Sequence, residues 1–103
     1  MKKLLTYGLA ALLMTVTALA QSLHKINDDV LGAYSKEDFS EMMAMYAIED
    51  TDAVKEMVSK GKVVGLRKGA LVYLESIDVL GGIAKVRPKG STTTVWIPSA
   101  FLD

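Results

Sequence analysis

The stretch that decides the fold is KGKVVGLRKGALVYLESIDVLGGIAKVRPKGSTTTVWIPSAFL, residues 60–102. Four short runs in it alternate apolar and other residues, or are rich in β-branched ones, as β-strands do: 63–66, 70–75, 83–87 and 92–97. Turns that contain glycine separate these runs. Several short strands joined by such turns predict a small β-barrel.

Alternation also assigns side chains to the two faces of each strand. Tyr73 projects from the face opposite Val72, and Lys85 and Arg87 project together from the third run. Trp96 lies in the fourth run. Arginine and lysine suit carboxylate ligands, so Tyr73, Lys85, Arg87 and Trp96 are the candidate ligand-binding residues. The alternative is that Tyr73 packs against a helix, the two cations are a solvated strand face, and Trp96 belongs to the core.

The chain begins with the pattern of a secretory signal peptide. Lys2 and Lys3 precede an apolar run over 4–19, and small residues at 18 and 20 suit a cleavage site before Gln21. The run is shorter than the roughly 20 residues that span a bilayer. We expect a cleaved signal peptide over 1–20 and export to the periplasm or the extracellular space. If the signal peptide is cleaved, the protein contacts the membrane only transiently, through this segment. The alternative is that the segment stays uncleaved and anchors the protein in the membrane.

Residues 35–61 have the period of two short helices. Ser35, followed three residues later by Asp38, is a helix N-cap signal, and Gly61 suits the end of the second helix. Helical spacing places four apolar residues on one stripe: Phe39, Met42, Met43 and Tyr46. We expect this stripe in the core; an adaptable contact surface rich in methionine is the alternative. Residues 21–34 lack a clear period and are expected to form an exposed lead-in, with a short strand or docking segment at 30–31.

The composition predicts a single small domain without metal or covalent chemistry. The chain has no cysteine and one histidine, His24. Disulfides, thiolate zinc sites and the familiar catalytic triads therefore have no support. His24 is expected to be a solvated side chain. We predict one compact domain over 35–103, with no catalytic residue, no metal, no cofactor and no enzymatic activity.

The charge of the chain is divided unevenly along its length. Residues 21–56 hold three lysines and nine acidic residues, whereas residues 57–103 hold seven basic and three acidic residues. One interpretation is that acidic helices neutralise a basic barrel. The other is that the barrel offers a basic face to an anionic partner. Nucleic acid is not expected as the partner, because the chain is predicted to be exported and its pI is near neutral.

A family resemblance rests on short motifs within residues 60–102. These are Lys68-Gly69, Val72 and Leu74, Gly81-Gly82, Lys85-Val86-Arg87, Gly90, Trp96-Ile97 and Ser99-Ala100-Phe101-Leu102. The pattern resembles the bacterial SH3 (SH3b) domain family. The resemblance implies an SH3-like barrel that serves as a binding module, commonly linked with cell-wall peptides or glycan. The opening strand of that family has no counterpart here, so residues 30–31, the helical hairpin or a second copy has to cover the exposed edge.

These inferences combine into one α+β prediction. An N-terminal helical hairpin (35–61) packs on an SH3-like β-barrel (62–103) after a cleaved signal peptide. The expected function is that of an exported, non-enzymatic binding module of the bacterial cell envelope. It would recognise a wall component, peptide or glycan, or another envelope protein through the barrel face. The alternative is a structural or interaction protein: a homo-oligomer such as a homodimer, or a subunit or inhibitor of another exported protein.

Overall fold

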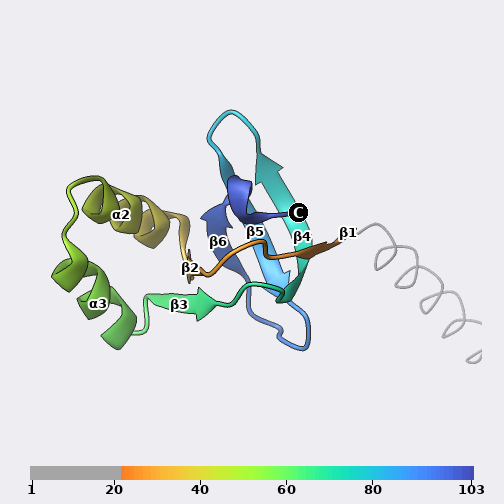
Figure 1. The fold of residues 1–103 in the computed structure, drawn as a ribbon, viewed down its shortest axis with the longest axis horizontal. Helices are drawn as coiled ribbons and strands as arrows, with labels where there is room; N and C mark the ends of the chain where they lie inside the picture. The colour runs from red at the N-terminus through yellow and green to blue at the C-terminus, as the bar shows by residue number, and fades with distance from the viewer. Residues whose placement is uncertain (1–21) are drawn as a thin grey trace, which may run out of the picture.

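The computed structural model describes residues 22–103 (Figure 1). Its elements in chain order are β1 (Ser22–Lys25), β2 (Val30–Ala33), α2 (Lys36–Ala47), α3 (Thr51–Ser59), β3 (Val63–Leu66), β4 (Leu71–Asp78), β5 (Ile83–Pro88), β6 (Val95–Pro98) and the 3₁₀ turn η1 (Ser99–Phe101). The predicted signal peptide, residues 1–20, lies outside the described residues.

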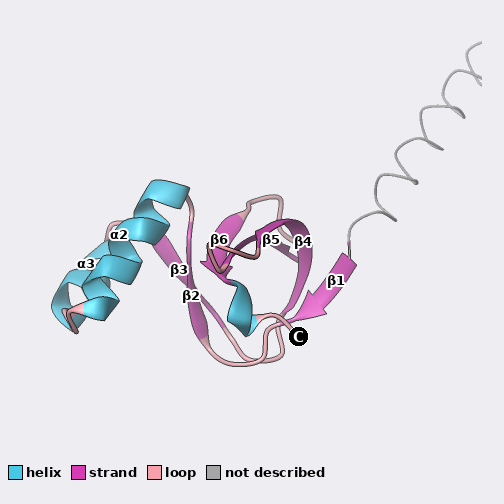
Figure 2. Ribbon diagram, turned by 90° about the horizontal axis from the view of Figure 1, so that it is seen from above, coloured by secondary structure: helices cyan, strands magenta, loops and turns pink. Residues whose placement is uncertain are grey.

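The strands form one antiparallel sheet in the order β1-β4-β5-β6-β2-β3. Figure 2 shows that the sheet curves strongly, with the two helices grouped at one end and β1 at the other. Among the described residues, no strand pairing joins β1 to β3. The sheet is therefore open, and β1 and β3 are its edges.

This architecture corrects the predicted order of elements. The prediction of an N-terminal helical hairpin packed on an SH3-like barrel is wrong. The strands form an open six-stranded sheet, and α2 and α3 follow β1 and β2 and are inserted between β2 and β3. β2 and β3 pair along their whole length, from Val30 opposite Leu66 to Ala33 opposite Val63. Residues 21–34, expected as a lead-in, thus supply two of the six strands. The sequences of β1 and β2, SLHK and VLGA, show no clear alternation, so only their pairing with other strands reveals them.

The two faces of the sheet bury two separate apolar clusters. The concave face holds the fully buried set Ile26, Val72, Ala84, Val86, Val95 and Ile97. The other face meets the helices through Ala33, Phe39, Met42, Met57, Val63 and Ile83. The sheet therefore has a core on both faces at its helix-bearing end, whereas its far end has a core on one face only.

β2 covers the edge for which the sequence offers no opening strand. It lies between β6 and β3, with Ala33 opposite Trp96. Its Gly32 is buried, and a Cβ atom at that position would lie 2.9 Å from Val95 Cγ2. The backbone of β2 therefore rests directly on the core. Of the three ways proposed to cover this edge, the structure uses the strand around residues 30–31.

Both helices begin at a side-chain cap, and for α2 this is the predicted residue Ser35. The Asp38 amide donates to Ser35 Oγ at 3.0 Å, and the Ala53 amide donates to Asp50 Oδ1 at 3.1 Å. Of the apolar stripe on α2, Phe39 and Met42 are buried. The next two members of the stripe, Met43 and Tyr46, remain 39% and 47% exposed. The core interpretation thus holds for the first half of the stripe alone.

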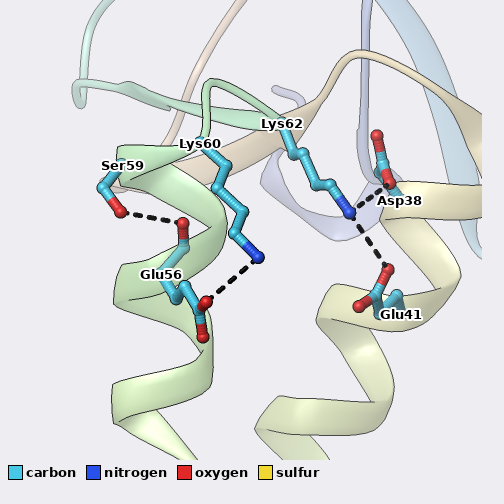
Figure 3. Close-up of polar contacts among 6 residues, drawn as sticks. All are labelled: Asp38, Glu41, Glu56, Ser59, Lys60 and Lys62. Atoms are coloured by element: carbon cyan, nitrogen blue, oxygen red, sulfur yellow. Dashed lines mark hydrogen bonds and ion pairs between the residues drawn. The ribbon is translucent and has the colours of Figure 1, made fainter.

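Polar contacts connect α2 to the start of β3, and others lie within α3 and at its C-terminal end (Figure 3). Lys62 Nζ lies 4.0 Å from Asp38 Oδ1 and 4.0 Å from Glu41 Oε2, so it reaches from the entrance of β3 to α2. Within α3, Lys60 Nζ lies 3.0 Å from Glu56 Oε1. Exposed ion pairs contribute little to stability. The apolar cluster between helices and sheet therefore provides most of the attachment.

The Ser35 cap gives a first testable prediction. Replacing Ser35 with alanine removes the acceptor for the Asp38 amide. We expect the free energy of unfolding, measured by urea denaturation, to fall by about 1 kcal/mol. The control is Ser40→Ala, an exposed position inside α2, where alanine favours the helix. Equal effects at the two positions would mean that the cap does not stabilise α2.

Candidate functional site

The four residues predicted to bind a ligand lie in one row across three strands. Tyr73 on β4 stands opposite Arg87 on β5, and Lys85 on β5 stands opposite Trp96 on β6. Because Lys85 and Arg87 are two residues apart on one strand, all four side chains share a face. We call these four residues the aromatic–cationic row.

Each cation of the row lies over an aromatic ring. Arg87 Cζ is 4.6 Å from the centre of the Tyr73 ring, and Lys85 Nζ is 5.6 Å from the centre of the Trp96 ring. A third cation, Lys36 at the start of α2, lies 5.8 Å from the Trp96 ring. Such contacts contribute about 0.5–1 kcal/mol each at exposed sites. They therefore favour a defined position for the charged groups.

The two cations of the row differ in how fully their polar groups are engaged. Arg87 Nη1 donates to the Ser91 carbonyl at 3.0 Å, and Arg87 Nε lies 3.9 Å from Glu75 Oε1. Lys85 has no carboxylate within ion-pair distance among residues 22–103. Lys85 is therefore the group with most capacity to receive an anion, and Arg87 is the more rigidly held neighbour.

The row runs from beneath the helices to the uncovered end of the sheet. Trp96 packs against the cluster under the helices and is half-buried. At the other end, Tyr73 stands opposite Leu23 of β1, which is 47% exposed. Leu71, two residues before Tyr73 on the same face, is 36% exposed. Apolar surface thus borders the cations at both ends of the row. Lys36 and Leu23 also lie beside the row. The sequence did not indicate these two residues, because only the tertiary fold brings them next to Trp96 and Tyr73.

His24 differs from the solvated side chain that the sequence suggests. It is half-buried, its Nδ1–H donates to the Asp103 carbonyl at 2.8 Å, and its Nε2 lies 2.9 Å from Ser22 Oγ. His24 therefore ties β1 to the end of the described chain. Between residues 22 and 103, no cluster of three or more His, Cys, Asp or Glu side chains is arranged to hold a metal ion. In the same range, no helix is long and apolar enough to cross a membrane.

A second surface lies beside β3 and was not identified from the sequence. A hollow of about 560 Å³ opens over Gly65, with Leu31 and Tyr46 as its walls and Arg67 at its end. The glycine inside the predicted strand 63–66 is the sequence signal that could have indicated it. We call this feature the Gly65 hollow.

Comparison with known proteins does not indicate a function for this chain. No protein-family model matches this chain, and no significant match was found among curated proteins or solved structures. The resemblance to the bacterial SH3 family remains a prediction.

Proposed function

We propose that this protein is an exported, non-enzymatic binding module of the bacterial cell envelope, which recognises a carboxylate-bearing wall component or envelope protein through the aromatic–cationic row. The observation that carries the proposal is the alignment of Tyr73, Arg87, Lys85 and Trp96 on one sheet face. Export is supported by the signal-peptide pattern of residues 1–20, and the envelope setting by the SH3b resemblance.

The chemistry of the row suits an anionic ligand that also has apolar surface. Within residues 22–103, Lys85 has no carboxylate at ion-pair distance. Arg87 is held in place by Tyr73 and Ser91. A positively charged group that is already positioned loses little entropy when a carboxylate binds. The rings of Tyr73 and Trp96 add flat apolar surface beside it. Wall peptides, which carry carboxylates and short aliphatic side chains, combine both features.

A test of this proposal is co-sedimentation of the purified protein with isolated cell-wall sacculi at low and moderate salt. Protein produced from the full chain is expected to bind at both salt concentrations. The Lys85→Glu/Arg87→Glu variant is expected to lose binding by at least about tenfold, since two favourable charge contacts become repulsive. Circular dichroism is used to check that the variant is folded.

The matched control is Lys55→Glu/Lys60→Glu on α3, which changes the net charge by the same amount away from the row. Salt-sensitive binding that both double variants lose equally would show general charge attraction, and the proposal would be wrong. No binding to sacculi combined with self-association of the protein would favour the structural alternative. The observation behind that alternative is the exposed tip of the β4–β5 hairpin, where Val79 and Leu80 are 77% and 102% exposed.

A further inference from the structure

Gly65 occupies a position for which the fold itself gives no reason to require glycine. It lies inside β3, where glycine weakens a strand unless a bulge, a left-handed conformation or a close approach requires it. The β2–β3 register is continuous, and Gly65 is not among the residues with positive φ. A Cβ atom there would meet nothing closer than Leu31 Cδ2 at 3.9 Å. By contrast, Gly32 on the paired strand is explained by its contact with Val95.

The missing side chain leaves apolar surface open above β3. Tyr46, at the end of α2, is 47% exposed and forms one wall of the Gly65 hollow. Leu31, directly opposite Gly65 on β2, forms another wall and is half-buried. Both side chains would lose water contact if a large apolar group lay over Gly65. The hollow is therefore suited to a side chain from another segment.

The backbone beside the hollow is also unpaired. The Tyr34 amide donates to the Lys62 carbonyl at 3.1 Å, which makes this pair a hydrogen-bonded one. Because hydrogen-bonded and non-hydrogen-bonded pairs alternate in an antiparallel ladder, the N–H and C=O groups of Val63 and Gly65 point away from β2. No strand of the described chain pairs with β3 on that side. These groups form a short template for an added strand.

The charge at the end of the hollow favours an acidic partner. Arg67, which lines the hollow, and Lys68, which follows it in the chain, are both exposed, and no ion pair holds either of them within residues 22–103. The one carboxylate that lines the hollow, Asp29, accepts a hydrogen bond from the Lys68 amide at 2.8 Å. Arg67 lies two residues after Gly65 and lines the same hollow.

We propose that the edge of β3 and the Gly65 hollow bind an extended segment of a partner polypeptide. The segment adds to β3 as an antiparallel strand and places a large aromatic side chain over Gly65, against Tyr46 and Leu31. An acidic side chain two residues earlier in the segment then lies opposite Arg67. Covering of an edge glycine by an aromatic residue from the neighbouring strand is a known way to stabilise such a position. This site is separate from the aromatic–cationic row, so the two proposals stand or fall independently.

The β3 strand of a second copy is a poor occupant of the hollow. The residues of β3 that point outward are Val63, which is 3% exposed and held under the helices, and Gly65 itself. Neither can fill the hollow of a second copy. A strand of four residues also extends about 13 Å, so pairing through it alone falls well short of the roughly 800 Å² per partner that a stable interface buries.

The test is an NMR titration of ¹⁵N-labelled protein, produced from the full chain, with three synthetic heptapeptides that have blocked ends. All three share a frame of threonine and valine. The first carries glutamate followed two residues later by tryptophan, the second carries lysine in place of glutamate, and the third carries alanine in place of tryptophan. We expect the first to shift the amide signals of Val63 and Gly65 and to bind at least about tenfold more tightly than the others.

Three variants link the binding to the hollow. Gly65→Val fills the hollow and is expected to reduce binding of the first peptide at least about tenfold while the protein stays folded. Arg67→Glu is expected to reverse the preference, so that the lysine peptide binds better than the glutamate peptide. Lys55→Glu, the same charge change on α3, is expected to alter neither.

Several results would overturn the proposal. These are the absence of β3 signal shifts at millimolar peptide, equal binding of the three peptides, and undiminished binding by Gly65→Val. Signals of β3 that move with protein concentration alone would show that a second copy pairs with the edge, which would also overturn it.

Loss of sacculus binding by the Lys85→Glu/Arg87→Glu variant, with peptide binding retained, would show that the two surfaces act separately.

Discussion

Replacing Ile26 with alanine is expected to lower the free energy of unfolding by about 2–5 kcal/mol. The Ile26 side chain is fully buried in the concave core, beside Val72 and Leu102. Its backbone bonds, to the Ala70 carbonyl at 2.9 Å and from the Gly69 amide at 2.7 Å, would survive the substitution. The loss would therefore come from the cavity and from the buried area removed. A domain of this size has a total stability on the order of 4–12 kcal/mol, so much of it would be lost.

Urea denaturation measures this effect, and Leu23→Ala is the matched control. Leu23 lies three residues earlier on β1 and is 47% exposed. Its truncation is expected to cost less than about 1 kcal/mol. A small effect at Ile26, similar to that at Leu23, would mean that residues before β2 are not part of the core. That result would return the segment to the exposed lead-in expected from the sequence.

The Gly32→Val substitution is expected to destabilise the protein by about 3 kcal/mol or more, the upper part of the range for overpacked cores. A Cβ atom at Gly32 would lie 2.9 Å from Val95 Cγ2 and 3.2 Å from Ile97 Cγ2. Val95 and Ile97 are 2% and 0% exposed, so neither can move aside. β2 would have to move away from β6. We expect a fall of roughly 10–20 °C in Tm, measured by thermal denaturation followed by circular dichroism.

Gly65→Val is the matched control, because it makes the same change in the paired strand. Its Cβ atom would have open space, with Leu31 Cδ2 at 3.9 Å as the nearest contact. Valine also favours a strand, so we expect a change within about 1 kcal/mol, in the stabilising direction. Similar losses at the two glycines would show that Gly65 has a structural role in β3. The proposal that its hollow serves a partner would then lose its first argument.

The sequence alone determined the elements whose signals are local. The side chain of Ser35 accepts a hydrogen bond from the amide three residues on, and it marks the start of α2 correctly. Alternation identified β3, β4 and β5, and it placed Lys85 and Arg87 on one face. Local signals were weaker at element ends: the fourth predicted strand began at 92, whereas β6 begins at Val95. Threonine favours strands, but without a pairing partner residues 92–94 remain outside the sheet.

Only the tertiary structure decided which strands pair and what the helices leave uncovered. β1 and β2 have four residues each, and their identity as strands comes from β4, β3 and β6. The same pairing turned Ile26 and Gly32 into core positions and left Tyr46 beside an open strand edge. The physical reason is that a strand is stabilised by hydrogen bonds and packing from residues distant in sequence, whereas a helix start is set by contacts three residues apart.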